Sequence, residues 1–423
     1  MERTQTFVAT LSLIVGGVGA LVAGCSPAAQ PTATPQATAT TQPAPTATIP
    51  APTATPTPGP QYELWAIDQS DADKGGAKLY IYASKDLEQK QAGTPEVVDL
   101  TVAAGGVGAG VGVRPHALSF NGTQTHALIA HVASGHVYVM RTKDRKVVAS
   151  IDVGEQAHWA AVSPDDKSIL VANQNGKKLA RITADFAAEK FTHDPAQDLN
   201  LAALEDKDYP DNAPICPLIF APGTQNTYVT LRGGGLLVVD AGSTPMKVVQ
   251  SLPKDIVSPA GCGGVATGGK VYIDSGTATS GHVYVFKPEG LAKTLVMTEY
   301  GTDTHGMMLV GKGRYLWVGN RGLGDNIVVI DTQTDTVAGM ITAVRPAPDI
   351  MGISPTGDIV YVAVRGPNPA TGGAPARGER PGVHALKVTQ NGASGEDWLF
   401  IPIGDQGATS TSDVHGVAVR VVK

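Results

Sequence analysis

Most of the chain alternates short apolar runs with polar turns, and within the runs apolar and polar positions follow the period of two that is typical of β-strands. Seven runs contain a similar tetrad of aliphatic, aromatic and small residues, spaced roughly 40 to 60 positions apart. The tetrads are Trp65–Asp68, Leu128–His131, Leu170–Asn173, Tyr228–Leu231, Tyr272–Ser275, Trp317–Asn320 and Tyr361–Val364. β-branched and aromatic residues dominate several later runs, such as 136–139, 282–285 and 327–330. The pattern predicts seven units of four antiparallel strands.

Seven four-stranded units predict an all-β fold, a seven-bladed β-propeller over residues 61–423. The composition agrees, because 50 glycines and 30 prolines in 423 residues favour turns over helices. The last unit supplies only a first strand, near 413–420, whereas the first unit, 62–103, supplies strands two to four. We therefore expect the two ends of the chain to share one blade, which would pair both open sheet edges.

The tetrads, together with the turns Ser163–Asp165 and Ser354–Gly357 between first and second strands, resemble the YVTN family of β-propeller repeats. The resemblance covers residues 61–423. It implies a seven-bladed propeller exposed on the surface of a bacterial or archaeal cell. It implies little about function, since propellers host ligand binding, scaffolding and several kinds of catalysis.

The N-terminal segment resembles a targeting signal. Residues 7–23 are apolar and follow Arg3, and Leu21–Cys25 resembles a bacterial lipoprotein signal. We predict a signal peptide over 1–24, a diacylglyceryl group on Cys25, and an extracytoplasmic protein anchored to the membrane; the alternative is a plain transmembrane anchor, for which the run is short against a bilayer of about 30 Å. Residues 25–60, rich in Pro, Thr and Ala and without charge, predict a lipid-anchored, semi-extended linker.

The distribution of charged residues argues against one class of partner, the nucleic acids. The net charge is -6, acidic and basic residues are interspersed, and the chain has no basic run. A nucleic-acid binder must neutralise phosphates with clustered Lys and Arg, so we expect no nucleic-acid partner.

Alignment of the seven units places a residue type that can bind metals at one position, the start of the first strand. These residues are His116, His158, Cys216, Cys262, His305, Asp349 and His415. First strands line the central channel of a propeller, so we expect a ring of these side chains at one mouth. Imidazole and thiolate together favour copper, zinc or iron over magnesium or calcium. Because they come from neighbouring blades, His116, His158 and His415 are the best predicted ligands.

Other interpretations of the ring stay open. The repeats share ancestry, so a purely structural ring is one alternative, and Cys216 and Cys262 form a disulfide if their Cα atoms lie within about 7 Å. The propeller domain of nitrous oxide reductase, which holds a copper cluster with histidines at its channel mouth, is similar in architecture, although three of the seven positions here are not histidine. That resemblance implies a copper-dependent oxidoreductase as an alternative to a metal-containing binding protein. A protein-interaction scaffold of the cell envelope without metal is the third function considered.

The ends of second strands return to the face that carries the ring. Side chains expected around the mouth, as a site for an anionic small molecule, are Arg114, His131, Asn173, Arg232, Asn320, Arg321 and Arg365. The alternative role of the arginines is that of ordinary solvated loop residues, and an envelope protein is an alternative partner. The loop 366–382 lies on the same face and is a candidate lid.

Two acidic segments, 205–211 and 68–73, are candidate calcium loops or simply solvated loops. Motifs of hydrolases, nucleotide-binding proteins and c-type haem proteins do not occur in the sequence.

Overall fold

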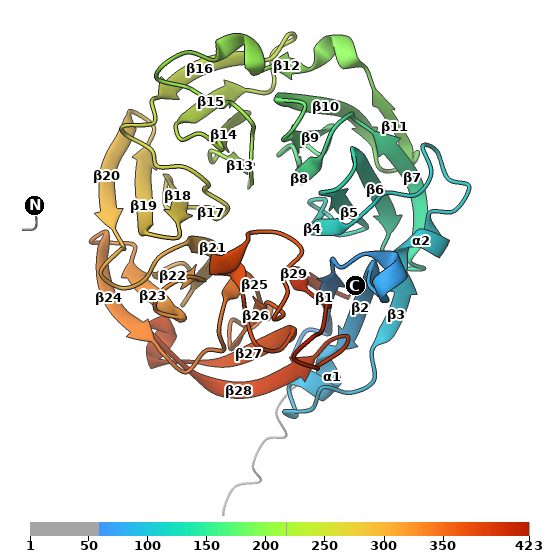
Figure 1. Ribbon diagram of the computed structural model, residues 1–423, viewed down its shortest axis with the longest axis vertical. Helices are drawn as coiled ribbons and strands as arrows, with labels where there is room; N and C mark the ends of the chain where they lie inside the picture. Colours follow the sequence, from blue (N-terminus) through green and yellow to red (C-terminus); the bar gives the residue numbers. More distant parts are fainter. Residues whose placement is uncertain (1–58, 217, 423) are drawn as a thin grey trace, which may run out of the picture. The chain divides into compact units, whose positions relative to one another are not determined.

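The computed structural model describes residues 59–216 and 218–422, whose strands form seven sheets around a central axis (Figure 1). The innermost strands are β29 (Val414–Val421), β4 (Pro115–Phe120), β8 (Ala157–Val162), β13 (Ile219–Phe220), β17 (Gly264–Thr267), β21 (Thr304–Val310) and β25 (Pro348–Ile353). The second strands are β1 (Tyr62–Asp68), β5 (His126–His131), β9 (Ser168–Asn173), β14 (Asn226–Thr230), β18 (Lys270–Thr277), β22 (Tyr315–Asn320) and β26 (Ile359–Val364). We number the blades 1 to 7 in this order.

The outer half of each blade completes an antiparallel sheet. The third strands are β2 (Lys78–Ala83), β6 (His136–Arg141), β10 (Lys178–Asp185), β15 (Leu236–Asp240), β19 (Ser280–Lys287), β23 (Asn326–Asp331) and β27 (Gly382–Thr389). The fourth strands are β3 (Glu96–Asp99), β7 (Lys146–Asp152), β11 (Lys190–His193), β16 (Lys247–Leu252), β20 (Gly290–Val296), β24 (Thr336–Ile341) and β28 (Ser394–Pro402). The short strand β12 (Leu199–Asn200) adds to β10 in blade 3. The predicted seven-bladed propeller is confirmed.

Helical segments in the described chain are short. They are α1 (Ser84–Leu87), α2 (Leu100–Ala103) and the 3-10 turns Ala72–Lys74, Pro195–Gln197, Ala202–Leu204, Ala374–Ala376 and Gln390–Gly392. Over residues 59–216 and 218–422, no helix has the length and apolar character needed to cross a membrane. The predicted signal peptide, the lipid attachment at Cys25 and the predicted linker up to residue 58 lie outside the described residues.

Blade 1 joins the two ends of the chain, as predicted. Its sheet order is β29-β1-β2-β3, and β29 pairs with β1 from Tyr62 opposite Val421 to Asp68 opposite Val414. The last strand of the chain therefore covers the edge that β1 would otherwise expose.

Neighbouring blades pack through apolar layers, which the alternation of side chains along each strand explains. In β1, Leu64 and Ala66 belong to a buried cluster shared with blade 7, while Trp65 and Ile67 belong to the cluster shared with blade 2. All four side chains are fully buried. Each tetrad thus contributes to both neighbours of its blade, and this is why the same pattern recurs seven times in the sequence.

Candidate functional site

The ring residues start the first strands, where the backbone aims them at the channel. His116, His158, His305, Asp349 and His415 each lie at an irregularity in the pairing between first and second strand. An extra residue in one strand of a pair turns its side chain away from the regular pleat. Cys216 and Cys262 precede the first residues of β13 and β17.

A second backbone feature repeats with the ring. In five blades the residue two positions before the ring residue has a positive φ between 53° and 66°, and these residues are Arg114, Gln156, Ala260, Asp303 and Ala347. Left-handed backbone at a residue other than glycine costs of order 1 kcal/mol and persists only where the surrounding structure requires it. The same turn therefore delivers each side chain to the mouth.

The four predicted histidines share one cavity of about 430 Å³ at the channel mouth. Its wall includes His116, His158, His305 and His415 together with Cys262. These five side chains come from blades 2, 3, 6, 1 and 5, whereas Cys216 and Asp349 do not line this cavity.

The two cysteines of the propeller are joined to each other. Cys216 and Cys262 form a disulfide between blades 4 and 5, with their Cα atoms 4.4 Å apart. Sulfur atoms in a disulfide are not thiolates and are poor metal ligands. In this state the predicted ligand set is reduced to imidazoles and one carboxylate, as the disulfide alternative requires.

The proton position on His116 follows from its neighbour Gln69. The Gln69 amide nitrogen donates to Asp413 Oδ2 at 2.8 Å, so its oxygen is the atom that faces His116 Nδ1 at 2.6 Å. Nδ1 must therefore carry the proton and donate it to that oxygen. His116 Nε2 is left with a free lone pair, and it is buried without a hydrogen-bond partner among the described residues.

His415 has the same arrangement. Its Nδ1 lies 3.2 Å from the carbonyl oxygen of His116, which can only accept, so Nδ1 donates. Burial lowers the pKa of His415 to about 3, which leaves the ring neutral at pH 7 and Nε2 bare. That bare nitrogen lies 3.5 Å from Asp349 Oδ1, where two lone pairs face each other with no proton between them.

His305 approaches the same carboxylate oxygen, with Nε2 3.2 Å from Asp349 Oδ1. The distance is that of an ion pair, but the hydrogen-bond angle is not met, and within the described chain both ring nitrogens are buried without partners. Burial also holds the pKa of His305 well below its usual value and keeps the ring uncharged, so the contact with Asp349 is not an ion pair.

His158 completes the set of neutral imidazoles. Its Nε2 lies 3.8 Å from Cys216 Sγ, and its buried Nδ1 finds no partner in the part of the chain described. Burial lowers the pKa of His158 to about 4 and that of His116 well below its usual value. All four rings are thus free bases at neutral pH, the form that binds metals.

A chain of buried ion pairs lies beside the imidazoles. Asp349 Oδ2 accepts from Arg321 at 3.1 Å and from Arg365 at 2.9 Å. Arg321 also pairs with Asp303 at 2.8 Å, and Arg365 with Asp413 at 2.6 Å. Burial would raise the pKa of Asp349, but the adjoining imidazoles of His415 and His305 and the two guanidiniums outweigh it and hold the pKa well below the usual range. Three carboxylates against two guanidiniums leave one surplus negative charge.

The arginines at the mouth are already paired. Arg114 contacts Asp71 at 2.9 Å, and Arg232 contacts Asp211 at 2.6 Å. Together with Arg321 they line the cavity, whereas Arg365 is fully buried behind it. Their charges are compensated, which weakens the expected attraction for an anion.

Three residues expected at the mouth do not line the cavity. The Asn173 amide bonds to the Val153 carbonyl at 2.6 Å, and that of Asn320 to Asn326 at 2.8 Å. The His131 ring packs against the Tyr138 ring at a tilt of 54°, with ring centroids 4.1 Å apart. These side chains are fully buried and hold turns at the ends of second strands, a role that the sequence did not predict for them.

The loop 366–382 covers part of the mouth. Residues Ala370, Thr371 and Gly372 line the cavity. The Ala370 backbone N–H donates to Asp413 at 2.7 Å, and Arg365 donates to the Thr371 carbonyl at 3.0 Å. The predicted position of this loop is confirmed, and the ion-pair chain that borders the imidazoles also holds it.

The acidic segments are cross-linked by cations. Glu205 pairs with Lys177 at 2.5 Å, while Asp211 pairs with Arg232 and Asp71 with Arg114. Calcium at either segment would have to displace these ion pairs.

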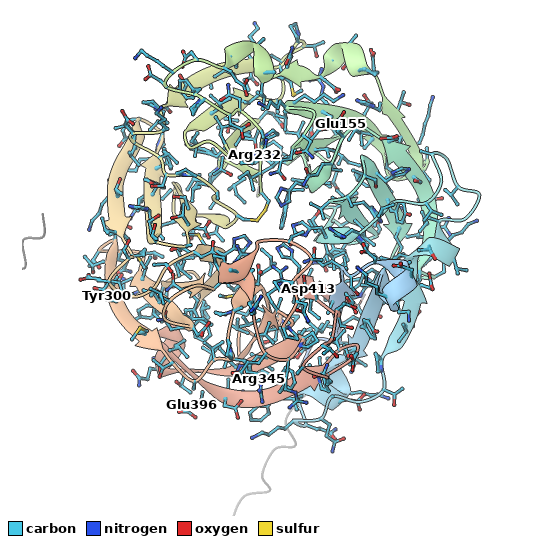
Figure 2. All side chains as sticks on the ribbon, in the orientation of Figure 1. Glu155, Arg232, Tyr300, Arg345, Glu396 and Asp413 are labelled. Carbon is cyan, nitrogen blue, oxygen red and sulfur yellow. A yellow bond between two sulfur atoms is a disulfide. The ribbon has the colours of Figure 1, made fainter. Side chains whose placement is uncertain are left out.

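Sequence reasoning missed the carboxylates Asp303 and Asp413, and also Gln69. A signal was present, because both aspartates occupy the position two before a ring histidine, in the tripeptides 303–305 and 413–415. Arg345 places its guanidinium 4.1 Å from the Phe400 ring, farther from the axis than Asp413 (Figure 2).

A carboxyl group adjoins the disulfide. Asp274 is fully buried, and its Oδ1 accepts from the backbone N–H groups of Cys262 at 2.9 Å and Gly263 at 2.6 Å. Burial raises the pKa of Asp274 to about 8, although the two backbone donors oppose the shift. The group is therefore mostly protonated at neutral pH and adds little negative charge.

No protein-family model matches the sequence, and no curated protein gives a significant match. Solved structures share the fold. A Lactobacillus plantarum protein is 12% identical with a TM-score of 0.60, over 86% of this chain and 100% of that one. The Pseudomonas aeruginosa periplasmic gluconolactonase is 15% identical with a TM-score of 0.58, over 86% and 100%. The Swd1 propeller domain of Myceliophteria thermophila is 11% identical with a TM-score of 0.51, over 80% and 100%. At these identities the likeness concerns the propeller fold alone.

Proposed function

We propose that this chain is an extracytoplasmic, lipid-anchored β-propeller of the YVTN type that binds a first-row transition-metal ion at the mouth of its channel. The metal is held by ring imidazoles, with copper and zinc as the preferred ions. The observation that carries the proposal is the set of buried, neutral imidazoles whose free ring nitrogens face one cavity without hydrogen-bond partners among the described residues.

The hydrogen bonds behind the rings support a metal. A histidine that binds a metal through one nitrogen usually donates its other N–H to a carbonyl or carboxylate group, which fixes the tautomer. His116 does so toward Gln69, and His415 toward a backbone carbonyl. Burying a polar nitrogen with nothing to bind costs about 1–3 kcal/mol, so the preset lone pair of His116 Nε2, which has no partner among the described residues, is expected to have a ligand.

Charge supports a cation over an anion. The imidazoles are neutral, the mouth arginines are paired, and the ion-pair chain carries one excess carboxylate. Imidazole nitrogens select copper, zinc, nickel or iron over magnesium and calcium, which prefer oxygen.

The location rests on sequence. Leu21–Cys25 resembles a lipoprotein signal, and the uncharged Pro-rich stretch after it would hold the propeller away from a membrane. The tetrads support the YVTN assignment.

The test is the metal content of the full chain, purified in detergent without chelator or metal-affinity resin. We expect close to one equivalent of a transition metal, or stoichiometric uptake of Cu²⁺ or Zn²⁺ by the metal-free protein in calorimetry. A matched control is His282→Ala, which alters a half-buried histidine on β19 outside the cavity. Occupancy below about a tenth of an equivalent with no uptake would overturn the proposal and favour a metal-free scaffold.

A further inference from the structure

The Cys216–Cys262 disulfide lies among the ring imidazoles. The ligand atoms of His158, Cys216 and Cys262 are all within 4.8 Å of one another, and so are those of Cys262, His305 and His415. Cys262 belongs to both groups. Its sulfur therefore lies between histidines from blades 3, 6 and 1.

The two sulfurs differ in access. Cys262 lines the mouth cavity and also a second, mostly apolar cavity of about 350 Å³ within the channel. Cys216 is fully buried, with His158 at its side. A small nucleophile in either cavity therefore meets Cys262 first, and Cys216 is the sulfur that would leave.

We propose that this disulfide is a redox-controlled pair of metal ligands. Closed, it leaves a site made of imidazoles; opened by a dithiol reductant, it adds Cys216 and Cys262 to His158 and to His305 or His415. The result is a mixed thiolate and imidazole site at the same place. The inference rests on the proposed metal site and specifies how its affinity and selectivity are controlled.

Reduction of the disulfide needs no reactant other than the dithiol. A thiolate of the reductant attacks Cys262 Sγ and forms a mixed disulfide, while Cys216 leaves with the bonding electrons and takes up a proton. The second thiol of the reductant then displaces Cys262, so that two electrons and two protons reach the protein and the reductant becomes a cyclic disulfide. Metal binding afterwards releases both protons.

Thiolate ligands change which ion is preferred. Soft sulfur donors select Cu(I) and Zn²⁺, and two Cys with two His is a common set for tetrahedral zinc. Imidazoles alone discriminate less among divalent ions. Opening the disulfide should therefore tighten binding and shift the preference toward soft ions.

The test compares oxidised and reduced full chain without any substitution. The protein is reduced with a phosphine, which becomes its oxide with oxygen from water, and the phosphine is removed anaerobically; a gain of two thiols per chain confirms opening. Co²⁺ is the optical probe, because a thiolate bound to Co²⁺ gives a charge-transfer band that imidazole does not. We expect the band in the reduced protein only, and Zn²⁺ binding tightened at least about tenfold.

Controls separate this inference from the proposed function. The double variant Cys216→Ala, Cys262→Ala should show no charge-transfer band under either condition, while His282→Ala should behave as wild type. Metal uptake by oxidised protein with no band after reduction would overturn the redox inference and leave the imidazole site standing. A band after reduction without uptake by oxidised protein would overturn the imidazole site of the closed state and support only the thiolate-containing site of the open state. Loss of the near-ultraviolet circular dichroism signal on reduction would also overturn the redox inference, since the metal ligands would then no longer be held in place by the fold.

Discussion

The imidazole rings of His116 and His415 stack, with centroids 3.8 Å apart and planes inclined by 19°. The lone pair of a ring nitrogen lies in the plane of the ring, so two nearly parallel rings present their lone pairs side by side. They do not converge on one ion without a rotation. His305 is inclined by 70° to His415, and both approach Asp349. These orientations make His305 and His415 a better pair of metal ligands than His116 and His415, although His305 and His415 come from blades that are not neighbours.

The first prediction follows from these orientations. His305→Ala and His415→Ala should each weaken Zn²⁺ binding by more than about tenfold, while His116→Ala should weaken it less. Competition with a chromophoric chelator measures the affinities, with His282→Ala as the unchanged reference. An equal loss for His116→Ala and His305→Ala would show that the stacked ring rotates to bind.

The repeat pattern was enough to predict the fold, and it placed the candidate ring residues at one position of the repeat, because both depend on local periodicity. Alternate residues of each tetrad must face opposite neighbours, and the ring position recurs at a fixed place before it. The ligand geometry was not predictable in this way. Whether Cys216 meets Cys262, and whether His305 or His116 pairs best with His415, depends on the channel width and ring rotation, which no single repeat encodes.

The partners in the ion-pair chain were likewise not predictable from the sequence. Asp413 and Arg365 are separated by 48 positions and meet only because blade 1 closes against blade 7. The sequence placed Arg365 near the mouth but did not predict Asp413 as its partner. The contacts that hold the loop over the mouth are therefore a product of closure.

Closure of the propeller through blade 1 can be tested by deletion. Removing residues 414–423 deletes β29, which buries Val414 and Val417 against blade 7 and pairs with β1. Each buried valine contributes about 1.5–3 kcal/mol, so we expect a fall of roughly 10 °C or more in the melting temperature. Removing only residues 422 and 423 is the control, since Val422 is exposed. Equal melting curves for the two deletions would contradict the shared blade.

The proposed lipid anchor depends on the side chain of Cys25. We expect Cys25→Ala to abolish lipid attachment, so that the protein leaves the membrane fraction or keeps its N-terminal segment. Cell fractionation and the mass of the N-terminal peptide measure the outcome, with Ser26→Ala as control. The lipoprotein hypothesis is wrong if neither quantity changes in the Cys25 variant.

Acid should destabilise the metal-free propeller through its buried histidines. The pKa of His158 falls from 6.5 to about 4 on folding, so the unfolded chain takes up the proton first as the pH drops. The contribution is present in full above pH 6.5 and is lost between pH 6.5 and 4, at up to about 1.4 kcal/mol per pH unit for each such histidine. Urea unfolding across this range should show a shallower pH slope for His158→Gln. His136→Gln, which alters a half-buried histidine on β6, should retain the wild-type slope.

The carboxyl of Asp274 should act in the opposite direction. Its pKa rises from 3.8 to about 8 on folding, because burial penalises the charged form. The folded chain therefore holds this proton more tightly, and the stability it contributes below pH 3.8 is lost as the pH rises toward 8.

Asp274→Asn removes the ionisation while keeping an oxygen that can accept from the backbone N–H groups of Cys262 and Gly263. Its melting temperature relative to wild type should rise by several degrees between pH 5 and 8, since each kcal/mol is worth about 2–4 °C or somewhat less in a propeller of this size. The exposed Asp255→Asn serves as the control and should show no such trend. If the difference in melting temperature between Asp274→Asn and wild type stays constant across this range, Asp274 is ionised in the folded protein. Its second carboxylate oxygen would then need a partner beside the disulfide.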